Sequence, residues 1–111
     1  MSHGREFAGR LRERIVIEAP VEERSATGVR VGDWEPVIRC LAAVEAKGAG
    51  PEAEGMALSA MGRFVMTIRW REGVALGQRV RWRGRLYLVK RLIDDPTLPD
   101  RIELECEEWR A

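Results

Sequence analysis

The chain has 111 residues, of which 45% are hydrophobic and 33% charged, and its formal net charge is +1. This composition excludes a disordered chain, and the length predicts one domain over residues 1–111. The small net charge gives no overall attraction to a polyanion. No apolar run approaches the roughly 18 residues of a membrane span or resembles a secretion signal, so we expect a protein that folds in a cytosol.

The residues that usually carry chemistry are sparse. Cys40 and Cys106 lie far apart, and we expect both thiols to be reduced and buried. Two thiols and the single His3 do not make a metal site or a histidine-based triad. Asp94 and Asp95 stand beside a proline, which favours turn residues over cation ligands. The sequence therefore predicts no metal, no cofactor and no enzymatic activity.

In chain order, the first predicted strand covers 12–19, and its two isoleucines share one face. Residues 19–33 are polar and contain a proline and two glycines, which predicts a loop or a loose hairpin connection. A long apolar strand follows at 34–46, and we expect it to be covered on both faces over part of its length, or bent. Pro36 has no backbone N–H and places the start of that strand at an edge or a bulge.

Residues 47–62 break the alternation, because their glycines and proline exclude a central strand. We expect a mobile inserted loop here, and a short helix after Pro51 is the alternative.

The strand predicted over 63–70 has the clearest alternation in the chain. Its inward face is expected to carry four apolar side chains, those of Phe64, Met66, Ile68 and Trp70. Residues 71–78 then form a turn region.

A hairpin is predicted over 79–93, with an Arg-Gly pair in its tight turn. Val80 and Trp82 point inward in the first arm, and the second arm returns with Leu86 and Leu88, or their neighbours, inside.

After a loop over 94–100, the last strand covers 101–109. It is expected to point Ile102, Leu104 and Cys106 inward, and Arg101, Glu103, Glu105 and Glu107 outward. About six strands with short connections and one long insertion predict an all-β fold, a small antiparallel barrel or sandwich.

The charges are distributed unevenly. From Arg63 to Arg91 there are nine basic residues and one acidic residue, whereas from Asp94 to Glu108 there are seven acidic residues and one arginine. Either the two segments neutralise each other as cross-strand ion pairs, or they form a basic and an acidic surface through which copies pack into a ring. The candidate contact residues are Arg79, Arg81, Arg83, Arg85, Glu103, Glu105 and Glu107.

Residues 79–85 raise the question of nucleic-acid binding, because they contain four arginines. The first three arginines alternate with Val80 and Trp82, so cations and aromatic ring lie on opposite faces of the strand. A platform for single-stranded nucleic acid needs both on one face. Base stacking and sequence readout are therefore not expected, while weak contact with a phosphate backbone or an acidic protein stays open.

Several motifs occur in a characteristic order. They are GRLRERIVIEAP (9–20), the tryptophan of DWEPV (33–37), AAVEA (42–46), VMTIRW (65–70), GVALGQRVRWRGRLYLV (73–89), IDDP (93–96) and ELECEE (103–108). This order, over almost the whole chain, resembles the head–tail joining proteins of tailed bacteriophages, also called head-completion or stopper proteins. Similar proteins occur in prophages and in gene transfer agents.

The resemblance implies a small β-barrel without enzymatic activity or cofactor. It implies a structural protein of the virion neck, made in the bacterial cytoplasm, that forms a ring between portal or adaptor and tail, helps to retain packaged DNA and docks the tail. The implied partners are other copies of the chain, the portal or adaptor ring, tail proteins and double-stranded DNA without sequence readout, and no membrane.

In the family the inserted loop points toward the channel, and the matching segment here is 47–62. One hypothesis is that this loop gates DNA, with Met56, Leu58 and Met61 packing against loops of adjacent subunits. The alternative is that it caps its own barrel. Two other functions stay open: a small β-barrel nucleic-acid-binding module that uses the 79–85 hairpin, and a tail-terminator or adaptor ring.

Overall fold

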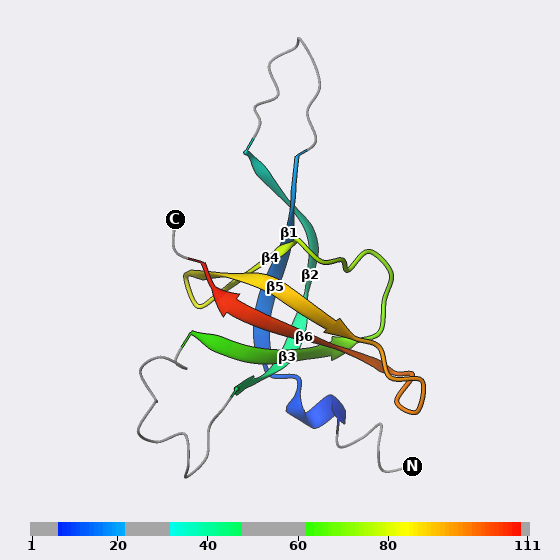
Figure 1. The fold of residues 1–111 in the computed structure, drawn as a ribbon. Helices are drawn as coiled ribbons and strands as arrows, with labels where there is room; N and C mark the ends of the chain where they lie inside the picture. Colours follow the sequence, from blue (N-terminus) through cyan, green and yellow to red (C-terminus); the bar gives the residue numbers. More distant parts are fainter. Residues whose placement is uncertain (1–6, 22–31, 48–61, 110–111) are drawn as a thin grey trace.

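The computed structural model describes residues 7–21, 32–47 and 62–109. They form one closed antiparallel barrel with the strand order β1-β2-β3-β6-β5-β4 (Figure 1). The strands are β1 (Glu13–Pro20), β2 (Trp34–Ala46), β3 (Arg63–Arg69), β4 (Arg79–Trp82), β5 (Arg85–Ile93) and β6 (Arg101–Glu108). The predicted all-β barrel is therefore confirmed.

β1 and β2 form a long hairpin that projects beyond the other strands (Figure 1). At its outer end the Val21 N–H donates to the Asp33 carbonyl at 2.9 Å. Ile38 is paired with β1, but the next pair along the hairpin involves Pro36, so Val37 is an extra residue on β2. The bulge predicted at Pro36 is confirmed, and it bends the hairpin where it leaves the barrel.

β2 exchanges partners along its length. It pairs with β1 over residues 34–42 and with β3 over residues 43–46. The Lys47 N–H donates to the Arg63 carbonyl at 3.0 Å, so the segment between β2 and β3 leaves and returns at neighbouring points. The segment between these points corresponds to the predicted insertion. Residues 48–61, with Met56, Leu58, Met61 and the helix suggested after Pro51, lie outside the described residues.

Gly62 is needed where this segment rejoins the barrel. Its carbonyl accepts a hydrogen bond from the Glu108 N–H at 2.6 Å, so the start of β3 and the end of β6 lie close together. A Cβ at residue 62 would lie 2.9 Å from the Cβ of Glu108, closer than side chains tolerate. A larger residue would push the end of β6 away.

The barrel interior is filled by alternate side chains from every strand, as expected for a closed sheet. The core consists of Ile15, Ile17, Ile38, Ala42, Met66, Ile68, Val80, Trp82, Tyr87, Val89, Ile102, Leu104 and Cys106. In the second arm of the β4–β5 hairpin, Tyr87 and Val89 are buried rather than Leu86 and Leu88. Of the two cysteines, which are both free, Cys106 is buried as predicted and Cys40 is only half-buried.

The prediction that Trp70 faces the core is wrong. β3 ends at Arg69, and the chain turns away from the barrel into the connection to β4, where Gly73 has a positive φ. Trp70 is 46% exposed, and its Nε1–H donates to the Asp94 Oδ2 at 3.3 Å. The alternation of apolar and polar residues in the sequence thus continues one residue beyond the end of the strand, where it no longer predicts burial.

A helical turn over 7–10, which the sequence did not predict, packs on the outside of the barrel. Phe7 is 1% exposed and forms a second apolar cluster with Leu11 and Ala43. The Arg101 guanidinium lies 4.1 Å from the centroid of the Phe7 ring. This turn covers the outer face of β2. Within the described residues, no helix has the length and apolar character needed to cross a membrane.

Candidate functional site

The candidate site is the charged outer surface of the barrel, which begins at the β4–β5 hairpin. Its turn consists of Arg83 and Gly84, with φ values of 52° and 77°. Two successive residues with positive φ are typical of a type I′ hairpin turn, which confirms the predicted position of the turn. The turn directs Arg83 outward while Val80 and Trp82, at 0% and 9% exposure, face the core as predicted.

Trp82 is part of the hydrophobic core, where it packs against other aromatic rings. Its ring meets that of Phe64 edge to face at 5.0 Å between centroids and lies 5.7 Å from that of Tyr87. Its Nε1–H donates to the Glu13 Oε1 at 2.9 Å, and the Arg83 guanidinium reaches the same carboxylate at 3.0 Å. Hydrogen bonds from Trp82 and Arg83 lower the pKa of Glu13. The ring of Trp82 is therefore occupied within the protein and presents no free face for base stacking.

Glu18 on β1 joins the other two arginines of β4. Its carboxylate accepts from the Arg79 Nε at 2.6 Å and from the Arg81 Nε at 3.3 Å. The side chains of Glu18 and Arg79 are only 9% and 13% exposed. Burial raises the pKa of Glu18, but the hydrogen bond and charge of Arg79, together with Arg81, outweigh burial and hold that pKa below its usual value. Glu18 is thus ionised at neutral pH.

Arg79 is also held between two tryptophans. Its guanidinium lies 4.4 Å from the ring centroid of Trp34 and 4.8 Å from that of Trp109, and the two rings meet edge to face at 5.1 Å. Trp109 directly follows β6, and its N–H donates to the Leu86 carbonyl at 2.8 Å. The contacts among Trp34, Arg79 and Trp109 therefore hold together the start of β2, the start of β4 and the end of β6. The sequence indicated Trp34 as a motif residue but not these partners.

Three of the four glutamates of β6 form ion pairs with basic residues that flank them, and Glu103 has no ion pair in the described part of the chain. Glu105 pairs with Lys47 at 2.7 Å and Arg91 at 3.8 Å, Glu107 with Arg63 at 3.5 Å, and Glu108 with Arg85 at 3.4 Å. Of the two alternatives from the sequence, this geometry supports neutralisation by cross-strand ion pairs rather than the formation of separate basic and acidic surfaces. It differs from the prediction in one respect, because Arg79, Arg81 and Arg83 pair with glutamates of β1 and not of β6.

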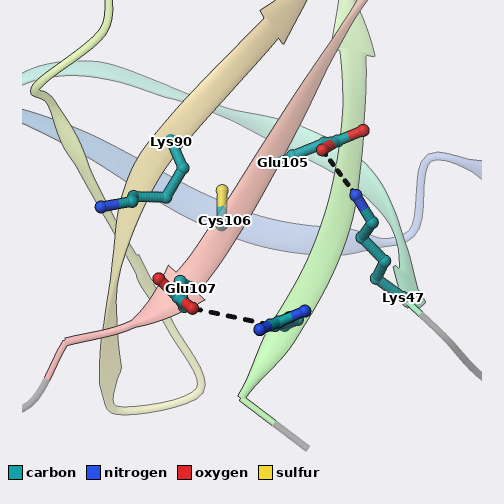
Figure 2. Close-up of a pocket in the computed structure, with 6 residues that line it drawn as sticks. Lys47, Lys90, Glu105, Cys106 and Glu107 are labelled. Carbon is teal, nitrogen blue, oxygen red and sulfur yellow. Dashed lines mark hydrogen bonds and ion pairs between the residues drawn. The ribbon is translucent and has the colours of Figure 1, made fainter. Parts of the chain in front are cut away.

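A pocket of about 240 Å³ opens over this part of β6 (Figure 2). It is lined by Lys47, Arg63, Lys90, Glu105, Cys106 and Glu107. Its carboxylates are already engaged by its own cations, and Figure 2 shows the Lys47–Glu105 pair and the contact made by Glu107. Burial, with a contribution from Glu105, raises the pKa of the Cys106 thiol to about 12, so the thiol is protonated and inert at neutral pH. The described residues also contain no group of three side chains that could hold a metal ion.

The connection between β3 and β4 is held by a residue that sequence analysis missed. Gln78 is buried, and its side chain donates to the Gly73 carbonyl at 2.8 Å and accepts the Ala75 N–H at 2.9 Å. These bonds fix the loop that carries the exposed Leu76.

Comparison with known proteins agrees with this geometry. A family model described as phage head completion protein matches residues 8–108, a range that includes all six strands of the barrel. Among solved structures, the chain is similar to protein SF1141 from Shigella flexneri 2a, with 26% sequence identity and a TM-score of 0.67. The similarity covers 90% of this chain and 94% of that chain. Comparison with curated proteins finds no match.

Proposed function

Because the chain belongs to the phage head completion protein family, we propose that it forms a ring in the neck between portal or adaptor and tail, retains packaged DNA and docks the tail. Membership supports a head–tail structural role as a component of the virion, and it favours a structural protein over an enzyme. The match over residues 8–108 is the observation that carries the proposal. Ring formation, DNA retention and tail docking are the proposed steps.

The shape of the barrel supports a role between two other rings. β2 has 13 residues, so it is roughly 40 Å long measured along the strand at about 3.3 Å per residue. The connection to β1 leaves from one end of β2, and the connection to β3 leaves from the other. A neck protein needs contact regions separated in this way, because its partners lie on opposite sides of it.

The alternative of a nucleic-acid-binding module has less support. Arg79, Arg81, Arg83 and Arg85 each form an ion pair with a carboxylate of the same chain. Binding of phosphates would have to compete with these carboxylates, which weakens the electrostatic gain of releasing counterions. The other alternative, a tail-terminator or adaptor ring, would place the protein elsewhere in the same particle. Its contacts with neighbouring proteins would be of the same kind.

Deleting the gene tests the proposed function. We expect electron micrographs of the resulting particles to show tail-less heads that are empty or leak DNA, beside free tails. The free tails distinguish a joining protein from a tail-assembly protein, whose loss would also remove or alter the tails. Complete, DNA-filled particles would contradict a head-completion role.

We also propose that the segment 47–62 contributes to DNA retention through Met56, Leu58 and Met61. Its two ends are joined by the hydrogen bond between the Lys47 N–H and the Arg63 carbonyl, so the segment can be shortened without moving β2 or β3. Removing residues 51–60 is expected to leave the melting temperature within a few degrees and to reduce the DNA content of assembled particles. Particles that keep their DNA after this deletion would show that the segment has no role in retention.

A further inference from the structure

The outer face of β1 and β2 carries charged and apolar side chains that the ion pairs of the barrel do not use. Arg14 and Arg39 are exposed, and neither has an ion pair or hydrogen bond within the described residues. They alternate with two aliphatic residues, because Arg14 is paired with Leu41 and Val16 with Arg39 across the two strands. We call Arg14, Val16, Arg39 and Leu41 the β1–β2 patch.

The β1–β2 patch is suited to a protein partner. Leu41 is 45% exposed, and Val37 at the adjacent bulge is 46% exposed. A pocket on these two strands is lined by the four residues of the patch together with Ile15 and Cys40. Arginine beside exposed aliphatic surface is the composition typical of protein–protein contacts, whereas a nucleic-acid footprint needs more phosphate contacts than two unpaired guanidinium groups provide.

A surface of complementary charge lies on the connection between β5 and β6. Asp94 is exposed, and neither Asp94 nor Asp95 forms an ion pair within the described residues. Trp70, 46% exposed, donates its Nε1–H to Asp94 and adds an aromatic face beside the carboxylates. Hydrogen bonds from Thr97 lower the pKa of Asp95, so this carboxylate is ionised at neutral pH. We call Asp94, Asp95 and Trp70 the acidic turn.

The β1–β2 patch and the acidic turn cannot meet within one molecule. In the closed strand order β1 is three positions from β6, and β2 is three positions from β5. Figure 1 shows β5 and β6 crossing in front of β1 and β2, with the connection 94–100 at the far end of β5. Two complementary surfaces on different sides of one molecule produce a head-to-tail contact that repeats from copy to copy and can close into a ring. Like charges disfavour pairing of the patch with itself.

We propose that the β1–β2 patch binds the acidic turn of a second copy of this chain, with Arg14 and Arg39 facing Asp94 and Asp95 and the Trp70 ring against Leu41. This inference rests on the proposed function, because it identifies the contact through which the ring would form. The partner is the same chain, since its own surface supplies both the carboxylates and the aromatic side chain that the patch lacks.

A charge-exchange experiment in particles tests the contact. One variant carries Arg14→Glu and Arg39→Glu, and the other carries Asp94→Arg and Asp95→Arg. Each is supplied alone to particles that lack the gene, and then both are supplied together. Alone, each variant brings like charges together at every contact, and we expect the yield of tailed, DNA-filled particles to fall by more than about tenfold. Together, the reversed patch of the first faces the reversed turn of the second, and unchanged surfaces meet at the alternate contacts, so the yield should recover.

A matched control changes the same number of charges elsewhere, with Arg12→Glu and Lys90→Glu, two exposed residues that form no ion pair in the described part of the chain. This control is expected to support normal particle yields. Melting curves establish that all the variants are folded. A normal yield from either single variant, or no recovery when two folded variants are combined, would overturn the assigned contact. Such results leave the gene-deletion phenotype intact, so failure of this contact is distinguishable from failure of the head-completion role.

Discussion

Trp82→Ala is expected to lower the free energy of unfolding by about 4 kcal/mol, which is the usual range for removing a buried large aromatic side chain. Trp82 is 9% exposed and packs against Phe64 and Tyr87 in the core. The substitution leaves a cavity bounded by these rings. It also removes the indole N–H that donates to Glu13, so a hydrogen bond is lost in addition to the packing contacts.

Chemical denaturation followed by circular dichroism measures this change. The matched control is Arg83→Ala at the neighbouring position, whose side chain is 68% exposed. Its loss should change stability by less than about 1 kcal/mol, because the ion pair with Glu13 is open to solvent. A stable Trp82→Ala protein that had instead lost affinity for free DNA would contradict the core assignment and support the nucleic-acid-binding alternative.

Glu18→Gln is expected to destabilise the protein by about 3 kcal/mol. The substitution keeps the size of the side chain but removes the negative charge that faces Arg79 and Arg81. Arg79 is 13% exposed and enclosed by the rings of Trp34 and Trp109, so its cation cannot recover full hydration. The destabilisation comes more from leaving the Arg79 cation buried without a counter-charge than from losing the ion pair itself. Thermal unfolding should show a decrease of roughly 15 °C.

The pH dependence gives an independent test of the same carboxylate. The folded-state pKa of Glu18 lies below its ordinary value of 4.5, so its stabilising contribution is complete above that value and is lost as the pH falls through the folded-state pKa. Glu18→Gln should therefore lose less stability on acidification than the parent protein does. The control is Glu107→Gln, because Glu107 and Arg63 are 46% and 56% exposed. Equal losses from the two glutamine substitutions would refute a special role for Glu18.

The position of each strand follows from local patterns. In β3 and β6 the alternation identified the buried Met66, Ile68, Ile102 and Leu104 without knowledge of any partner strand. Alternation works because successive side chains of a strand point to opposite faces, whatever strand lies beside it. Trp70 shows the limit of this argument, because the end of a strand depends on where its backbone loses its partner.

The candidate contacts depend on which strands become neighbours. Arg79 and Glu18 are 61 residues apart in the chain, and only the pairing of β4 with β1 brings them to 2.6 Å. The same holds for the stacking of Trp109 and Trp34 on Arg79, which requires the end of β6 to lie beside the start of β2.

By itself, the sequence determined the all-β fold, most of the inward-facing residues and the resemblance to head–tail joining proteins, because these depend on alternation and on the order of motifs along one chain. The tertiary structure decided which charges are neutralised and which are left over. Closure of the barrel assigned Arg79, Arg81 and Arg83 to the glutamates of β1, and it left Arg14 and Arg39 without ion-pair partners in the described part of the chain. Pairing between distant charges is set by strand order and register, which no local period encodes.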